Sequence, residues 1–296
     1  MNVLISGSDG FLGTNFIRLS PEFIIKEICL IKNKVEDVDF QSIDTVLHLA
    51  ALVHQMKGAS DEEYFRVNRD LTYQFAFRAK KSGVKHFIFM STVKVYGEST
   101  TNSDPWDEGS KCLPEDAYGK SKLEAEKLIR KLEDDNFKVS IIRAPLIYGP
   151  GVKGNLISIL KLVNKFPILP LGNIKNKRSM VYVGNIIELI KHIIKTSKSG
   201  VFLGGDNRVL STTELCQIVA KGLNKKLILI SIPNLFICMA KKIKPNIIER
   251  LWGSLEINNH ITNQTLVFTP PYSVEYGMAE MICWFKSIKK SNGRIL

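Results

Sequence analysis

The feature that most constrains the fold lies at the N-terminus, where three spaced glycines separate a short apolar run from a helical pattern. Residues Asn2–Ser6 predict a strand, Gly7-Ser8-Asp9-Gly10-Phe11-Leu12-Gly13 predict a turn, and Phe11–Leu19 predict a helix that ends before Pro21. Glycine lets the backbone approach a pyrophosphate closely, and the helix N-terminus stabilises its charge. The strand before and the helix after make this a dinucleotide-binding βα unit.

A second motif carries acid–base chemistry. The apolar strand His86–Met90 delivers Ser91 and Thr92, and Tyr118 and Lys122 stand four residues apart at the start of a helical pattern that runs to Leu132. That spacing places the phenol and the ammonium on one helix face, where the ammonium favours the phenolate. A Tyr-x-x-x-Lys pair alone arises by chance, so its weight comes from the glycine loop.

The two motifs together resemble the extended short-chain dehydrogenase/reductase superfamily, in the branch with a Gly-x-x-Gly-x-x-Gly loop that acts on nucleotide-activated sugars. The resemblance covers nearly the whole chain. It implies an α/β fold, a Rossmann-type doubly wound parallel sheet with a smaller C-terminal substrate-binding lobe. We expect the sheet domain in residues 1–145, with 178–205 returning to it, and the lobe in residues 146–177 and 206–296. The resemblance also makes Thr92, Tyr118 and Lys122 the catalytic residues.

The cofactor preference depends on the second strand, which we expect at Glu27–Ile31. Dinucleotide folds place an acidic residue after this strand to bind the ribose hydroxyls of NAD, whereas a cation accommodates the 2′-phosphate of NADP. Lys32 occupies that place, so the sequence favours NADP(H), with NAD(H) still possible. Only about a dozen residues precede the next strand, Thr45–Ala51, so the intervening unit looks trimmed, and Asp37 and Val38 are the expected adenine contact.

The resemblance implies further cofactor contacts around the same edge. The glycine-loop residues Gly7, Asp9, Gly10, Phe11, Leu12 and Gly13 are joined by Leu49, Ala50, Ala51, Asn68, Ser91, Tyr118, Lys122 and Pro145. His48 is expected to be structural, and Ser91 is expected to back up part of the role of Thr92. Asn68 lies in the helical pattern Glu63–Ser82, which Gly83 closes.

The sugar nucleotide has its own implied contacts. Thr92, Val93 and Tyr118 would meet the sugar, Asn155 and Leu156 the diphosphate, Leu169 and Leu171 the base, and Arg178 the diphosphate again. A guanidinium fork suits phosphate oxygens. The resulting substrate is a nucleoside-diphosphate sugar, with UDP the expected nucleotide.

Three reactions share this equipment in the family. A 4,6-dehydratase carries Asp-Glu after the catalytic threonine, and this chain has Val93-Lys94, which nearly excludes that reaction. A 4-keto-6-deoxy-N-acetylhexosamine reductase and a UDP-hexose 4-epimerase remain. The preferred prediction is the reductase, because Lys32 favours NADPH and because segments 93–100, 150–155 and 253–255 resemble reductases of bacterial surface-polysaccharide synthesis. The 4-epimerase is the alternative.

Composition limits the other classes of function. The net charge of +12 invites a nucleic-acid interpretation, but the lysines are spread along the chain and indicate a basic solvated surface. The apolar run Leu227–Ala240 is about 14 residues long, too short for a membrane span of about 20, and is expected in the core. Five scattered cysteines without Cys-x-x-Cys spacing indicate reduced thiols in the cytoplasm.

The histidines form no ligand-spaced cluster, so we expect no metal. No basic-then-apolar leader precedes the first strand, and we expect no membrane insertion and no nucleic-acid partner. The resemblance allows a homodimer through the helices after Asn68 and Tyr118. A non-catalytic NADP-binding scaffold stays open, although the complete set of Thr92, Tyr118 and Lys122 argues against it.

Overall fold

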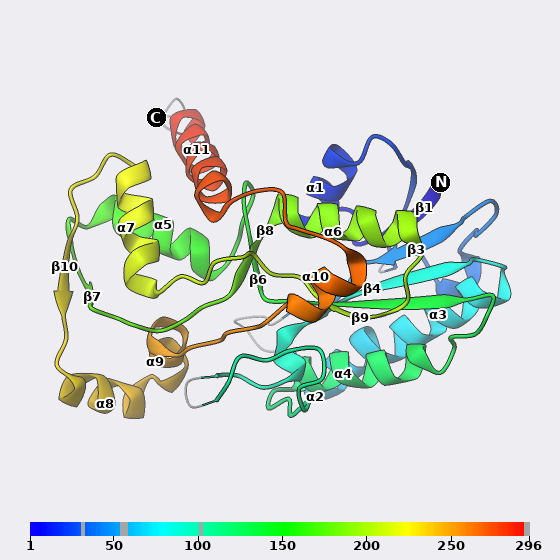
Figure 1. Cartoon of the computed structure of the whole chain (residues 1–296), viewed down its shortest axis with the longest axis horizontal. Helices are drawn as coiled ribbons and strands as arrows, with labels where there is room; N and C mark the ends of the chain where they lie inside the picture. Colours follow the sequence, from blue (N-terminus) through cyan, green and yellow to red (C-terminus); the bar gives the residue numbers. More distant parts are fainter. Residues whose placement is uncertain (31–32, 54–58, 101–102, 293–296) are drawn as a thin grey trace.

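The computed structural model describes residues 1–30, 33–53, 59–100 and 103–292. Its centre is a sheet of six parallel strands in the order β2-β1-β3-β4-β5-β9 (Figure 1). The strands are β1 (Asn2–Ser6), β2 (Ile24–Ile28), β3 (Thr45–His48), β4 (His86–Thr92), β5 (Lys138–Ala144) and β9 (Gly200–Leu203). The strand order reverses between β1 and β3, so the loops that follow these two strands border the topological switch point where such folds bind ligands.

Two helical layers cover the sheet. Helices α1 (Phe11–Leu19) and α6 (Val183–Thr196) pack on one face, and α3 (Leu71–Lys81) and α4 (Ala117–Arg130) pack on the other (Figure 1). Side chains alternate along the strands and build a core on each face of the sheet. On β4, Ile88 and Met90 lie in the core with α1 and α6, and Phe87 and Phe89 lie in the core with α3 and α4. Parallel strands buried on both faces are near-continuous apolar runs, as here.

Short elements connect these layers. They are η1 (Val35–Asp37), α2 (Asp61–Phe65), a π-helical turn η2 (Arg66–Asp70) and η3 (Val93–Val95). The helical pattern predicted from Glu63 to Ser82 is therefore interrupted at Asn68. Only η1 lies between β2 and β3 in the described residues, which agrees with the trimmed unit expected there.

The second strand begins and ends earlier than predicted. We expected Glu27–Ile31, but Ile24 and Ile25 already pair with Asn2 and Val3. The reason is that β2 is an edge strand with largely exposed side chains, so its apolar pattern does not mark its bounds. Residue Lys32 lies outside the described residues.

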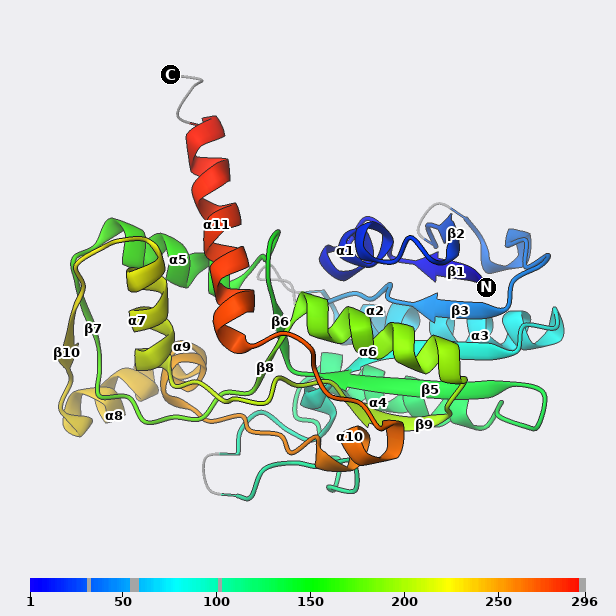
Figure 2. The ribbon, with the colours of Figure 1, turned by 45° about the horizontal axis from the view of Figure 1, so that its top comes forward.

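The remaining elements form a second group beside the carboxyl ends of the strands (Figure 2). It contains the paired strands β7 (Ile168–Gly172) and β10 (Ile228–Ser231) and the paired strands β6 (Leu146–Tyr148) and β8 (Met180–Tyr182). Its helices are α5 (Asn155–Lys165), α7 (Thr212–Gly222), α8 (Asn234–Ile243), α9 (Pro245–Trp252) and α11 (Val274–Asn292). Helix α10 (His260–Leu266) instead packs near β9.

The expectation that Leu227–Ala240 is core is wrong. Strand β10 pairs with β7 alone, and α8 packs against α9, so most of the large apolar side chains of this segment are exposed. In the described ranges, no helix combines the length and the hydropathy that crossing a bilayer requires. No cluster of three or more metal-ligating side chains occurs among those residues either.

Candidate active site

The catalytic residues predicted from the sequence meet at the carboxyl end of β4. Thr92 is the last residue of that strand, and Tyr118 lies in the first turn of α4, where the Thr92 hydroxyl hydrogen-bonds its phenol. Asp116 caps this helix by accepting a hydrogen bond from Gly119 N at 2.7 Å, and Lys94 of η3 forms an ion pair with Asp116 at 2.7 Å. The cap fixes the start of α4 against the end of β4.

Lys122 is one turn further along α4 and is almost completely buried. Its Nζ donates to the main-chain oxygen of Met90 at 2.7 Å and lies 4.2 Å from the centre of the Phe89 ring. Burial lowers the pKa of Lys122 to about 7, and the nearby Glu126 carboxylate opposes that shift. Burial therefore favours the neutral amine of Lys122.

The pKa of Tyr118 differs in direction from the sequence expectation. Burial raises it to about 12, the negative charge of Asp116 and the Tyr64 phenol raise it too, and the hydrogen bond from Thr92 opposes the rise. We expected Lys122 to lower this pKa. In the structure the amine of Lys122 is instead engaged by the Met90 carbonyl. Burial therefore favours the protonated phenol of Tyr118.

Ser91 does not duplicate Thr92. Neighbouring strand residues project to opposite faces, and the Ser91 hydroxyl donates to Glu126 Oε1 on α4. Glu126 in turn forms a buried ion pair with Arg143 at 2.6 Å, and Arg143 Nη1 donates to the Tyr96 hydroxyl at 2.8 Å. This network beneath the catalytic residues was missed from sequence, because its members are dispersed along the chain.

The glycine loop has the shape that a dinucleotide requires. Gly7 has φ +77°, and a Cβ on it would lie 2.7 Å from Ala50 N, while a Cβ on Gly13 would lie 2.2 Å from the Gly7 oxygen. Glycine at both positions brings α1 and the loop after β3 close to β1. No side chain caps the N-terminus of α1, which leaves its amides for a pyrophosphate. The residues present therefore fit a dinucleotide.

The loop after β3 is fixed from both sides. His48 lies between the Ser6 hydroxyl at 2.6 Å and the Thr72 hydroxyl at 2.9 Å, and burial, with the nearby Lys122, lowers its pKa to about 3. It is structural, as predicted. Asn68 accepts from Leu52 N at 2.8 Å and donates to Ser121 Oγ at 3.1 Å, which ties the loop to α4. Leu49, Ala50 and Ala51 are partly exposed beside the glycine loop.

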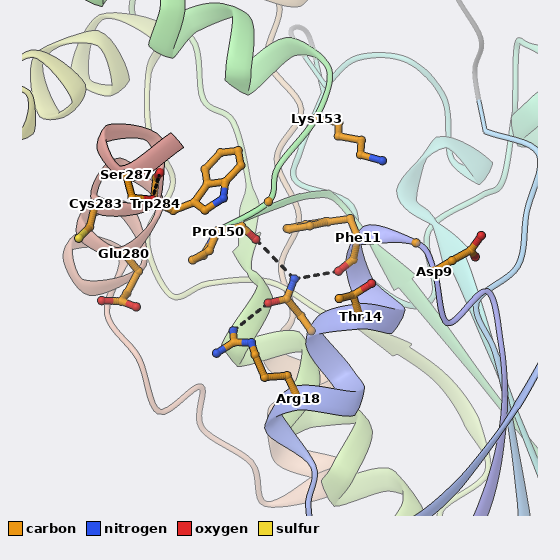
Figure 3. A pocket seen from close by; sticks show the side chains of 13 residues that line it. Asp9, Phe11, Thr14, Arg18, Pro150, Lys153, Glu280, Cys283, Trp284 and Ser287 are labelled. Atoms are coloured by element: carbon orange, nitrogen blue, oxygen red, sulfur yellow. Dashed lines mark hydrogen bonds between the residues drawn. The ribbon is translucent and has the colours of Figure 1, made fainter. Parts of the chain in front are cut away.

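A cavity of about 560 Å³ extends from the glycine loop to α11 (Figure 3). Asp9, Gly10 and Phe11 line it from the glycine loop, and Trp284 lines it from α11, across from Phe11; Lys153 lies near Phe11 (Figure 3). The residues Thr92, Tyr118 and Lys122 do not line it. Pro145 is buried directly after β5, at the same edge of the sheet.

The predicted diphosphate contacts lie together. Asn155, Leu156 and Arg178 line one small cavity, and Arg250 of α9 lines it too. Asn155 is the first residue of α5, whose N-terminus has no side-chain cap. Arg178 Nη1 donates to the Gly253 oxygen at 3.0 Å, and neither arginine forms an ion pair within the described part of the chain. Burial lowers the pKa of Arg178 and the positive charge of Arg250 adds to this, while Glu249 opposes it.

Arg250 was missed from sequence. It is a single cation in an amphipathic helix, and only the fold brings it to Arg178. Two guanidinium groups and a helix N-terminus without a side-chain cap are groups that suit an anion such as a diphosphate.

Leu12 and Leu156 belong to the hydrophobic core, and four further predicted ligand residues also have their side chains in the core. Val38 packs with Val35 and Phe40 against α3, Val93 packs around η3, and Leu169 and Leu171 face inward from β7. All four are buried, and on β7 the alternate residues are the exposed ones. The structure therefore does not support side-chain contacts to adenine, sugar or base at these positions. Asp37 is exposed in η1.

Comparison with known proteins is decisive for the family. Residues 3–203 match the family described as NAD dependent epimerase/dehydratase family. The chain belongs to that family.

Two relatives are similar over most of their length. The UDP-glucose 4-epimerase of Vibrio cholerae is 35% identical over 94% of this chain and 94% of its own. The N-acetyl-alpha-D-glucosaminyl-diphospho-ditrans,octacis-undecaprenol 4-epimerase of Escherichia coli O157:H7 is 32% identical over 76% of this chain and 73% of its own.

Among solved structures, MoeE5 in complex with UDP-glucose and NAD superposes with a TM-score of 0.77 over 98% of this chain and 100% of that chain, at 19% identity. This agreement shows the shared fold. As a member of the epimerase/dehydratase family, the chain is an NAD(P)-dependent enzyme of nucleotide-sugar metabolism, with the Rossmann-type sheet that the sequence predicted.

Proposed function

We propose that this family member is a 4-epimerase of a UDP-hexose. The observation that carries the proposal is the 35% identity, over 94% of both chains, to a protein named UDP-glucose 4-epimerase. The second relative is also named as a 4-epimerase of a diphosphate-linked sugar. The sequence alone favoured the reductase and kept the epimerase as its alternative; the relatives shift the preference.

The chain's own groups fit this chemistry. In its phenolate form, hydrogen-bonded by Thr92, Tyr118 accepts the proton of the C4 hydroxyl as the hydride leaves C4 and gives it back as the hydride returns, and Thr92 holds the C4 oxygen in place. A bound nicotinamide would supply a reversible hydride acceptor for C4. Lys122 supports the ribose beside Tyr118. Val93 and Lys94 follow Thr92, so the acidic pair that a dehydratase carries there is absent. Lys94 instead forms ion pairs with Glu98 and Asp116.

The cavity with Arg178, Arg250 and the α5 N-terminus would hold the diphosphate. An anchor on the diphosphate allows the sugar to turn between oxidation and reduction, because it leaves the hexose ring free of tight contacts. We propose that the sugar lies between this anchor, in the lobe of residues 146–177 and 206–296, and the catalytic residues of the sheet domain.

The 4-keto reductase is the second candidate, and Lys32 is the residue that favours it. Its ammonium would attract the 2′-phosphate of NADP. Lys32 lies outside the described residues, so the preference for NADP(H) over NAD(H) stays a prediction.

A substrate experiment separates the two. The purified protein is incubated with UDP-glucose or UDP-N-acetylglucosamine and a trace of NAD, and the products are resolved by chromatography. We expect the galacto-configured product without lasting change in nicotinamide absorbance. Stoichiometric loss of NADPH with a UDP-4-keto-6-deoxy-N-acetylhexosamine, and no conversion of the hexoses, would establish the reductase instead.

A further inference from the structure

Helix α8 presents a stripe of large apolar side chains to solvent. Leu235, Met239 and Ile243 follow one another at intervals of one turn, and Phe236 lies beside them. These four side chains are 56 to 77% exposed. Single exposed apolar residues are ordinary, but four on one helix face form a patch that a protein normally covers.

The neighbouring ribbon enlarges the apolar surface. Ile168 of β7 and Ile228 of β10 are register partners, and Ile230 lies two residues further along β10, where the register shifts. All three are 50 to 60% exposed. Strand β10 continues directly into α8 at the end of the molecule away from the sheet domain (Figure 1).

The charge around this surface is strongly positive. Residues 221–252 contain seven cations and one anion, Glu249, which Lys241 engages at 3.2 Å. The remaining lysines stand at both ends of the surface: Lys225 and Lys226 precede β10, and Lys242 and Lys244 lie at the end of α8, all exposed. An apolar stripe flanked by exposed lysines matches the interface of an anionic bilayer, which accepts both.

A second copy of the chain fits this surface less well. A two-fold contact places the same patch on both partners, which would bring two sets of uncompensated lysines together. Helix α8 has 10 residues, about 15 Å, so it can lie along a bilayer surface and cannot cross one.

We propose that α8 and the β7–β10 ribbon dock this lobe on an anionic phospholipid membrane, with the apolar stripe at the level of the headgroups and the lysines on the phosphates. This inference goes beyond the proposed reaction and does not depend on which sugar is the substrate.

Vesicle sedimentation tests the docking. The full-length protein is mixed with vesicles of phosphatidylcholine alone, or of phosphatidylcholine and phosphatidylglycerol in equal parts, at low and at high salt. We expect the protein to sediment with the anionic vesicles at low salt and to be partly released at high salt. No sedimentation with anionic vesicles would overturn the proposal.

Two variants connect binding to the surface. L235E/F236E and K242E/K244E should each lower partitioning onto the anionic vesicles at least tenfold. V267E, which changes another exposed apolar residue far along the chain near α10, should bind like the parent protein. Turnover of a soluble sugar nucleotide should be the same in all four proteins, which shows that the variants fold.

Two other results would contradict the docking. Vesicle binding that persists in L235E/F236E would place the contact elsewhere on the molecule. Self-association of the parent protein that L235E/F236E abolishes, measured by analytical ultracentrifugation without lipid, would assign the stripe to a second copy of the chain.

Discussion

The amine of Lys122 donates to the main-chain oxygen of Met90 at 2.7 Å, although its helix position places it one turn from Tyr118. The two groups therefore do not form the simple ammonium–phenol pair that a Tyr-x-x-x-Lys motif suggests. Burial raises the pKa of Tyr118 to about 12, which favours the protonated phenol. We expect bound ligand to redirect Lys122.

The buried Lys122 makes stability depend on pH. Because burial lowers its pKa from 10.5 to about 7, the unfolded chain binds more protons than the folded protein between these values, and the free energy of unfolding rises with pH there. His48 and Glu126 are titratable groups that interact electrostatically with Lys122. Lys122→Met should lack this rise and be more stable than the parent protein at pH 6, by about 2–5 kcal/mol. Urea unfolding at pH 6 and pH 10 measures it, and equal differences at both pH values would contradict the assignment.

Replacing the proton donor should stop the chemistry without unfolding the protein. Tyr118→Phe should lower kcat about 10²–10⁴-fold, the range for positioned acid–base groups. Tyr73→Phe, at a partly buried tyrosine of α3 that stacks on Phe77, is the control and should keep parental kcat. The measurement is steady-state turnover with a thermal melt of each variant. Activity of Tyr118→Phe within a few-fold of the parent would remove Tyr118 from the reaction.

Variants at Thr92 and Ser91 should have different effects, the first mainly on kcat and the second on stability. Thr92→Val keeps the shape and removes the hydroxyl that meets Tyr118, so kcat should fall at least tenfold. The same hydroxyl caps η3 by accepting from Lys94 N at 3.3 Å, so the free energy of unfolding should also fall, by about 0.5–2 kcal/mol. Ser91→Ala removes the donor to buried Glu126 and should lower the free energy of unfolding by about 1–3 kcal/mol. Kinetics and urea unfolding of both variants check this. A large loss of kcat in Ser91→Ala and none in Thr92→Val would reverse the two roles.

The two arginines should act on the diphosphate. Arg178→Ala and Arg250→Ala should each weaken UDP binding by about 1.5–3 kcal/mol, the value of hydrogen bonds to charged groups. Lys177→Ala is the control, because this exposed lysine adjoins Arg178 and is paired with Glu256. Calorimetric titration with UDP alone measures the affinities. If Arg250→Ala binds UDP as the control does, the diphosphate does not reach α9.

Most of the fold could be predicted from local patterns in the sequence. The strand–glycine–helix unit, the apolar strands and the helix that begins near Tyr118 are all local patterns, and all occur where the sequence placed them within a few residues. The bounds predicted for the edge strand β2 were wrong, because an exposed strand has no buried face that marks its position in the sequence.

Spatial neighbours were harder to predict. Val93, Leu169 and Leu171 look like ligand contacts in the chain order, but strand alternation and packing around η3 turn their side chains into the core. Arg250 could not be predicted, since its approach to Arg178 depends on how α9 packs. The apolar run Leu227–Ala240 was wrongly predicted to lie in the core, because an apolar pattern in the sequence does not show which surface, if any, covers it.

The most direct test of the central claim uses UDP-glucose carrying deuterium at C4. An epimerase that removes the C4 hydride and returns the same hydride should yield UDP-galactose with the deuterium still at C4, seen by nuclear magnetic resonance of the product. Absence of UDP-galactose, or a product without deuterium at C4, would contradict the proposed reaction.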